Sequence, residues 1–251
     1  MNKYDQIQGF RRNMGPLLPL FLSGFVTYFG LILKTGTDPI FWILNFVFRD
    51  TLNFGVVIYC ILVLLVFTLI YQRYLSELDS FNSKFLLYMR RKYFHLLIIF
   101  LIVPPLYVSP TTCSLSLSFA FFGMCVSEFV RVLDFGGFGK QISEFYKSSL
   151  DEKDSGKLAM SHIYLLFGCA FPIWIENNFS VQALSGVLAV GIGDAVASII
   201  GIKFGRHRWF GSKKSIEGTL GFICSILASS LCIEYFANPS NKFTFQKAII
   251  S

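Results

Sequence analysis

An acidic residue of this 251-residue chain stands deep within an apolar run, where a carboxylate is costly. Asp194 lies within residues 181–202, an apolar run long enough to cross a bilayer as a helix. A carboxylate inside a membrane span costs about 2.5 kcal/mol or more on insertion scales, so it needs a partner, a metal ion or water. Asp194 is therefore the first candidate for a residue that does chemistry.

Small residues recur at every fourth position around Asp194. They are Ala189, Gly193, Ala197, Gly201 and Gly205. On a helix this spacing forms one smooth groove, which is typical of close helix–helix packing. Packing does not explain Asp194, and small residues also let an anionic ligand approach the backbone. We therefore keep both roles open for Gly201 and Gly205.

A basic loop follows the groove and leads into the last apolar run. Its candidates for binding an anion are Lys203, Arg206, Arg208, Lys213, Lys214 and Ser215. Glu217 and Gly218 come next, where the start of a helix would offer free N–H groups near Gly218 and Thr219. Lysines neutralise phosphates as point charges. Groove, carboxylate and lysine pair together suit a nucleoside triphosphate with Mg²⁺, whereas binding of bare lipid head groups would not explain Asp194 or Glu217.

Three further features leave two interpretations open. His95 stands in the first turn of an apolar run, where a histidine is expensive unless it is hydrogen-bonded or functional. Asp154 belongs to a dense charge cluster at 151–157, which is either a solvated face or a source of carboxylates for a divalent cation. Glu128 and Arg131 are three residues apart and either form a structural ion pair or belong to a polar pocket.

The elements that must position these residues are membrane helices. The chain is 54% hydrophobic and only 15% charged, whereas soluble domains carry about 25% charged residues. This composition excludes a disordered chain and an ordinary soluble enzyme. A nucleic-acid-binding module is also excluded despite the net charge of +7, because the bases sit in short gaps between apolar runs. We expect an all-α fold, a polytopic transmembrane bundle that forms a single membrane domain over residues 1–251.

We expect six to seven spans, with residues 40–48 lying at the interface and 75–89 forming an amphipathic surface helix. The spans are residues 17–33, 54–71, 93–108, 113–130, 181–202 and 219–236, with a shorter one at 163–175. Three loops, 72–92, 131–162 and 203–218, hold five Lys or Arg each. Because positive loops stay cytoplasmic, the three loops and the N-terminus would share the cytosolic face.

The motif Gly193-Asp194-x-x-Ala197-x-x-x-Gly201-x-x-x-Gly205, followed by residues 213–219, resembles the CTP-binding signature of dolichol kinases and related CTP-dependent polyprenol kinases. Arg91-Lys92-x-Phe94-His95 and the segments 151–156 and 161–169 also match that family. The resemblance covers roughly residues 88–236. It implies a multi-pass enzyme of the endoplasmic reticulum membrane whose nucleotide is held on the cytosolic side by residues 189–219.

The resemblance also implies a reaction, in which the γ-phosphate of CTP passes to the hydroxyl of dolichol and gives dolichyl phosphate for protein glycosylation. CTP, dolichol or another polyprenol, and membrane lipids would be the partners, with Mg²⁺ or another divalent cation as cofactor and no nucleic acid. Asp194, Asp154 and His95 would be catalytic, and Asp194 and Glu217 would hold the metal. The alternatives are a CTP-dependent diacylglycerol kinase, a cytidylyltransferase that makes a CDP-lipid, or a membrane scaffold.

The chain departs from the family pattern in two respects. Ser215 stands where a threonine is usual. The chain stops at Ser251, whereas family members continue through further spans and have a longer N-terminal membrane region. We therefore expect a fragment or a short isoform.

Overall fold

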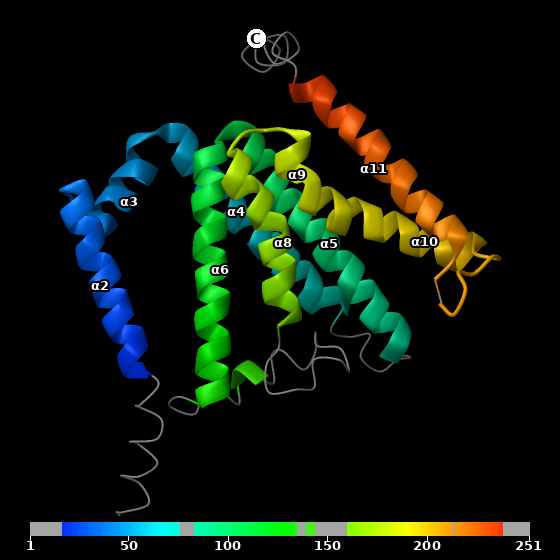
Figure 1. Cartoon of the computed structure of the whole chain (residues 1–251), viewed down its shortest axis with the longest axis horizontal. Coiled ribbons are helices and arrows are strands. Elements are labelled where there is room, and N and C mark those ends of the chain that lie inside the picture. The colour runs from blue at the N-terminus through cyan, green and yellow to red at the C-terminus, as the bar shows by residue number, and fades with distance from the viewer. Residues whose placement is uncertain are drawn as a thin grey trace, which may run out of the picture. The chain divides into compact units, whose positions relative to one another are not determined.

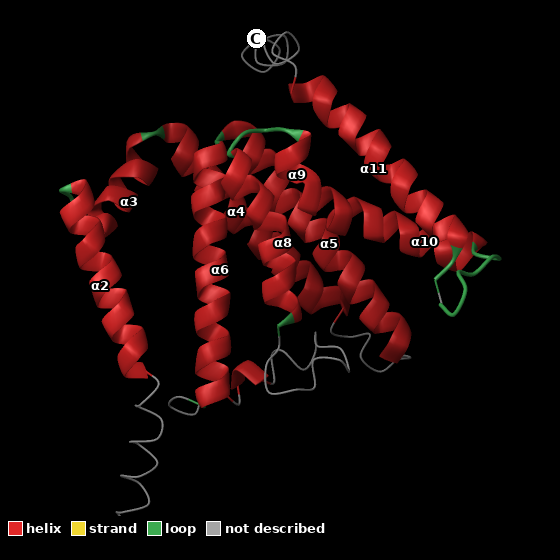
Figure 2. Cartoon of the chain, viewed as in Figure 1, coloured by secondary structure: helices red, strands yellow, loops and turns green. Residues whose placement is uncertain are grey.

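The computed structural model of the chain describes residues 17–75, 83–134, 139, 141–143, 160–212 and 214–237. The regular elements in these ranges are helices, as Figure 2 shows, which confirms the predicted all-α membrane fold. The predicted residues Asp154 and Lys213, and most of the predicted surface helix before Ser83, lie outside the described residues. The helices in chain order (Figure 1) are α2 (Leu17–Thr35), α3 (Pro39–Arg49), α4 (Thr51–Ile70), the π-helix η1 (Tyr71–Leu75), α5 (Ser83–Val108), α6 (Pro110–Leu133), α8 (Ser161–Glu176), α9 (Val181–Val187), the π-helix η5 (Leu188–Gly193), α10 (Asp194–Phe204) and α11 (Ile216–Ala237).

The predicted number of six to seven spans is higher than the structure supports. Within the described residues, four helices are long and apolar enough to cross a membrane, namely Thr51–Arg73, Pro110–Leu133, Val181–Phe204 and Ile216–Ala237. A fifth span arises if the pair Gly24–Thr35 and Pro39–Arg49, bent by 63°, counts as one. The expected spans at 93–108 and 163–175 correspond to the shorter apolar helices Lys92–Val108 and Ser161–Glu176. The first of these is the C-terminal part of α5, which begins at Ser83, and Asn177, in the left-handed conformation at φ 43°, ends the second.

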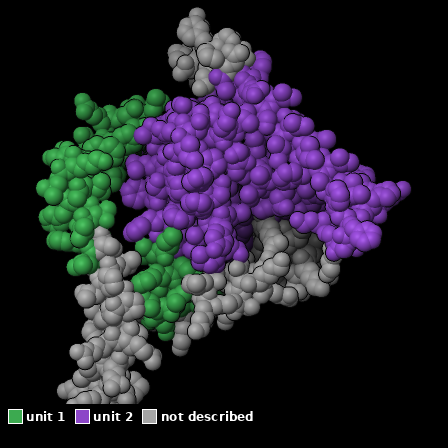
Figure 3. Space-filling model, viewed as in Figure 1, with its two compact units in different colours: residues 1–54, 125–158 green, residues 55–124, 159–251 purple. Residues whose placement is uncertain are grey.

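The chain divides into two compact units (Figure 3). Unit 1 holds residues 1–54 and 125–158, and unit 2 holds residues 55–124 and 159–251. In unit 1, Gly36 at φ 69° ends α2, and Asp38 Oδ1 accepts the N–H groups of Ile40 and Phe41 to start α3 at Pro39. This cap sits inside an otherwise apolar stretch, so it explains why the helix breaks there.

Unit 1 also contains the ion pair that its sequence spacing indicates. Arg131 Nη2 lies 2.7 Å from Glu128 Oε1, and Arg131 Nε donates to Glu128 Oε2 at 2.8 Å. The Glu128 side chain is buried, so this two-point contact satisfies a carboxylate that would be costly alone.

The core of unit 2 is formed by α5, α6, α8, α9 and the π-helix η5. Its buried members include Leu106, Cys113, Ile173, Leu184 and Val187. Helices α8 and α9 approach so closely that a Cβ at Gly186 would lie 2.1 Å from the Gly168 carbonyl oxygen. Large hydrophobic side chains on α4 and α11 are exposed instead, which is the arrangement that lipid covers in a membrane protein.

Candidate active site

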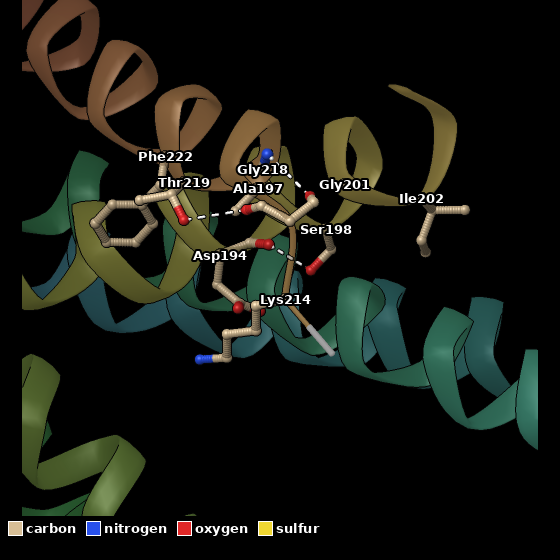
Figure 4. A pocket seen from close by; sticks show the side chains of 10 residues that line it. Asp194, Ala197, Ser198, Gly201, Ile202, Lys214, Gly218, Thr219 and Phe222 are labelled. Carbon is tan, nitrogen blue, oxygen red and sulfur yellow. Dashed lines mark hydrogen bonds between the residues drawn. The ribbon is translucent and has the colours of Figure 1, made fainter. Parts of the chain in front are cut away.

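A cavity of about 460 Å³ lies between α10 and α11 in unit 2 (Figure 4). Its lining residues are Asp194, Ala197, Ser198, Gly201, Ile202, Lys214, Ser215, Gly218, Thr219 and Phe222. The carboxylate of Asp194 and the amine of Lys214 therefore meet at one cavity, as the sequence motif suggests. Apolar walls come from Ala197, Ile202 and Phe222.

Asp194 is positioned by a π-helix that the sequence pattern did not predict. The spacing of small residues indicates a continuous α-helix, but residues Leu188–Gly193 form η5. The Asp194 N–H accordingly donates to the carbonyl of Ala189, five residues earlier. A π-segment widens the turn and shifts the helical register, so the predicted groove from Ala189 to Gly205 is not one straight stripe. Such segments occur frequently at functional sites.

Glycines in η5 allow two neighbouring helices to come close to Asp194. A Cβ at Gly191 would lie 2.7 Å from Ile99 Cγ1 on α5. A Cβ at Gly193 would lie 2.6 Å from Phe222 Cε2 on α11. The packing role predicted for the small residues is thus confirmed for Gly193, which lets α11 come close, and Gly191 lets α5 reach the site.

Helix α5 supplies a lysine and a histidine to Asp194. Lys92 Nζ donates to the Asp194 carbonyl oxygen at 2.9 Å and lies 3.5 Å from Asp194 Oδ2. His95 Nδ1 also lies 3.5 Å from Oδ2. The side chains of Lys92 and His95 are only 16% and 12% exposed, whereas that of Asp194 is 57% exposed. The carboxylate is therefore held on one side by α5 and accessible on the other.

Lys92 is a site residue that belongs to a motif shared with the family but was not predicted to take part in the site. Lysine at the start of an apolar run is normally read as a flank that reaches the lipid head groups. The available signal was its spacing, because Lys92 lies three residues before His95 and shares its helix face. The contact with Asp194 also gives the intramembrane carboxylate the partner that it needs.

The loop between α10 and α11, residues 205–215, is closed by hydrogen bonds, and we call it the clasp loop. Arg208 and Ser215 form an antiparallel bridge. The Trp209 N–H donates to the Lys214 carbonyl at 3.1 Å, and Trp209 Nε1 donates to Thr219 Oγ1 at 3.0 Å. The backbone of Lys214 is thereby fixed next to the cavity that its side chain lines.

Glu217 secures the clasp loop and does not line the cavity. Its Oε1 lies 2.7 Å from His207 Nδ1 and accepts the His207 backbone N–H at 3.1 Å. The structure does not bring Glu217 together with Asp194. In the part of the chain that the structure describes, no group of three or more His, Cys, Asp or Glu side chains could hold a metal ion.

Ser215 occupies the space next to Gly205 and Gly218. A Cβ at Gly205 would lie 2.7 Å from Ser215 Cβ, and one at Gly218 would lie 2.9 Å from Ser215 Oγ. Ser215 Oγ accepts the Gly218 N–H at 3.1 Å, and the Ser215 carbonyl accepts the Thr219 N–H at 3.2 Å. The expectation of free N–H groups at Gly218 and Thr219 is therefore wrong, because Ser215 caps the helix.

The remaining predicted residues lie at the edge of the site or away from it. Gly201 and Gly218 line the cavity, whereas Gly205 does not. Lys203, Arg206 and Arg208 are exposed and lie outside the cavity lining. Lys203 Nζ instead lies 5.6 Å from the centre of the Phe204 ring.

Four of the described helices are long and apolar enough to span a membrane, and a cavity with a carboxylate and a lysine lies at the end of two of them. The chain is therefore a polytopic membrane protein with a polar site. Comparisons with known proteins identify its family. The chain is 38% identical over 226 residues to a dolichol kinase of Schizosaccharomyces pombe, with 84% of the chain and 44% of that protein aligned. It is 35% identical over 195 residues to a dolichol kinase of Arabidopsis thaliana, covering 76% and 33% of the two chains. It is 33% identical over 219 residues to dolichol kinase of Homo sapiens, covering 79% and 39%.

By these matches the chain belongs to the dolichol kinase family, as its motifs indicate. It spans less than half the length of the curated relatives it matches. A phytol kinase of a Synechocystis strain is 37% identical over 84 residues, which is 33% of each chain. No protein-family model matches the chain. No solved structure matches it either.

Proposed function

We propose that the chain carries the phosphate-donor site of a CTP-dependent lipid kinase that transfers the γ-phosphate of CTP to dolichol. One observation carries the proposal. Asp194 and Lys214 line one cavity at the end of two candidate spans, and Lys92 contacts Asp194 from α5, in a chain whose relatives are named dolichol kinases.

The two lysines suit a triphosphate. Lys214 lines the cavity, and Lys92 Nζ lies 3.5 Å from the Asp194 carboxylate that also lines it. Phosphoryl transfer depends mostly on positioning and on neutralising the phosphate charges, which lysines do as point charges. The cavity volume of about 460 Å³ is within the range of small-molecule sites. The hydrogen bonds of the clasp loop hold Lys214 in place, which serves the positioning.

Asp194 would hold a divalent cation together with phosphate oxygens of the nucleotide. Mg²⁺ prefers oxygen ligands and is often held by one or two carboxylates together with substrate phosphates. Asp194 is accessible for this role, whereas the carboxylate of Glu217 is engaged by His207. When bound, the cation would offset the charge on the phosphate oxygens. We therefore assign the metal to Asp194 and a positioning role to Glu217.

The apolar part of the cavity suits a lipid alcohol. Ile202 is 73% exposed on α10, and Phe222 lies on α11, so both belong to candidate spans that face lipid. The prenol chain would remain in the bilayer while its hydroxyl reaches Asp194. The alcohol oxygen forms a bond to the γ-phosphorus, the bond to the β–γ bridging oxygen breaks, and CDP leaves with that electron pair. The alcohol proton is released to water.

The membrane side follows from charge. The clasp loop belongs to one of the three loops that hold five Lys or Arg each, and such loops remain in the cytosol. We therefore place the CTP site on the cytosolic face and, with the family, the chain in the endoplasmic reticulum membrane.

Labelled CTP tests the proposal. The chain is purified in lipid nanodiscs, and binding of CTP and transfer of label to dolichol are both measured. We expect CTP to bind and the γ-phosphate alone to be transferred, with both lost in Asp194→Asn and retained in the control Lys203→Met. Transfer of the cytidine moiety would indicate a cytidylyltransferase, and label on diacylglycerol instead of dolichol would indicate another lipid kinase. A chain that binds no CTP would overturn the assignment of the donor site.

A further inference from the structure

The clasp loop presents two aromatic side chains at its tip. Phe210 is fully exposed and is the most exposed large hydrophobic side chain of the described residues. Trp209 beside it is half exposed. The hydrogen bond from Trp209 Nε1 to Thr219 satisfies the only polar group of these two side chains, so the exposed surface is apolar. A rigid loop that ends in uncovered aromatic rings needs an apolar environment to cover them.

The tip of the clasp loop lies close to the bilayer because the loop is short and joins two candidate spans. The clasp loop connects Val181–Phe204 with Ile216–Ala237, and both segments are candidate spans. Phe210 is therefore within roughly 20 Å of the end of α10 even for a fully extended chain. The folded loop is shorter than this limit, because Trp209 pairs with Lys214. Figure 1 shows the loop at the right-hand edge of the view, where α10 ends and α11 begins.

Basic side chains flank the aromatic tip. Arg206 and Arg208 are exposed, and no salt bridge to either occurs among the described residues. Lys203 lies about one turn before Arg206 on the chain. Tryptophan and other aromatic side chains are enriched at membrane interfaces, and adjacent Lys and Arg bind anionic head groups. Aromatic rings with exposed arginines beside them thus match one partner, the surface of a bilayer with anionic lipids.

We propose that Trp209 and Phe210 insert into the interfacial layer of the membrane, with Arg206 and Arg208 against the phosphates of anionic lipids. The insertion holds the loop that carries Lys214 at the depth where a lipid hydroxyl lies. Only this last consequence rests on the proposed function. The insertion itself requires neither CTP nor catalysis.

Fluorescence of Trp209 tests the insertion without an activity assay. The chain is placed in nanodiscs made with or without lipids brominated on their acyl chains. Because the chain has three tryptophans, the Trp209 signal is taken as the difference between the wild type and Trp209→Phe. Leu231 is exposed within α11. Leu231→Trp, made in the Trp209→Phe background, gives the reference signal for a tryptophan embedded in lipid.

We expect brominated lipid to quench Trp209 and aqueous acrylamide to quench it little. Phe210→Ser should shift the Trp209 emission to the red, and this substitution cannot disturb packing because Phe210 is fully exposed. Arg206→Gln with Arg208→Gln should reduce the bromolipid quenching in nanodiscs that contain phosphatidylserine and leave it unchanged in neutral ones. Strong acrylamide quenching would show a loop in water. Protection from both quenchers would show a loop covered by protein, and either result overturns the proposal.

Discussion

Lys92 offers the sharpest test of the site, because it reaches Asp194 from a different helix. The change is Lys92→Met, which keeps most of the side-chain volume and removes the charge. Two contacts disappear, the hydrogen bond at 2.9 Å to the Asp194 carbonyl and the charge contact at 3.5 Å to Oδ2. If Lys92 also binds a phosphate oxygen of the nucleotide, CTP loses one charge-assisted hydrogen bond.

The size of the effect can be estimated from burial. Hydrogen bonds to charged groups contribute about 1.5–3 kcal/mol, which corresponds to a rise in Kd of roughly 10- to 150-fold. Asp194 is 57% exposed, so solvent screening places the expected loss at the lower end. We expect CTP to bind about tenfold more weakly to Lys92→Met. Lys92→Arg keeps the charge, so its affinity for CTP should lie between those of the wild type and Lys92→Met.

The assay is equilibrium binding of labelled CTP to the purified chain in nanodiscs with Mg²⁺. Lys203→Met is the matched control, because Lys203 is also a lysine beside the site but lies outside the cavity lining. Thermal unfolding of each variant confirms that it is folded. Equal CTP affinity of folded Lys92→Met and Lys203→Met would refute the placement of the triphosphate next to Lys92.

Three further predictions concern packing and the clasp loop. Gly186→Ala should lower the free energy of unfolding by about 1–3 kcal/mol, because its Cβ would lie 2.1 Å from the Gly168 carbonyl oxygen. Gly168→Ala is the control and should leave the melting temperature unchanged, since nothing lies within 4 Å of its Cβ. Ser215→Ala removes the cap of α11 and should cost about 1 kcal/mol in thermal unfolding; an unchanged melting temperature would show that the cap is dispensable. Glu217→Gln should weaken CTP binding, since the loop that carries Lys214 loosens, and leave the Mg²⁺ concentration for half-maximal binding unchanged. A rise in that Mg²⁺ concentration would instead make Glu217 a metal ligand.

Residue type and local spacing were enough to single out Asp194. A carboxylate in an apolar run is costly wherever it lies, so its importance does not depend on the tertiary fold. The position of Lys214 at the same cavity could also be predicted from the sequence, because the loop that joins α10 to α11 is short and keeps Lys214 near α10.

Lys92 and Glu217 required the structure. The contact of Lys92 with Asp194 depends on α5 passing close to Gly191, and no local pattern reports which helix packs there. The resemblance to the family implied that Glu217, together with Asp194, holds the metal. Its actual partner, His207, is ten residues away and is selected by the closure of the loop.

The break between α2 and α3 was predictable, because the sequence already separates the apolar run 17–33 from the short stretch 40–48. Gly36 and the cap of Asp38 before Pro39 account for it. The π-helix before Asp194 has no comparable signal, because its residues are as small and apolar as those of an α-helix. In the structure the π-helical register of residues 188–193 goes together with the packing of Gly191 against α5 and of Gly193 against α11.

A CTP analogue with a photoreactive group on its γ-phosphate tests most directly whether the triphosphate lies at Asp194. The full chain is labelled in nanodiscs with Mg²⁺, digested, and the modified peptides are identified by mass spectrometry. We predict labels on peptides that contain Lys92 or lie within 194–219, suppressed by excess CTP and lost in Asp194→Asn. Labels that excess CTP does not suppress, or that fall on the unit 1 cavity lined by Trp42, Arg49 and Asp50, would contradict this placement.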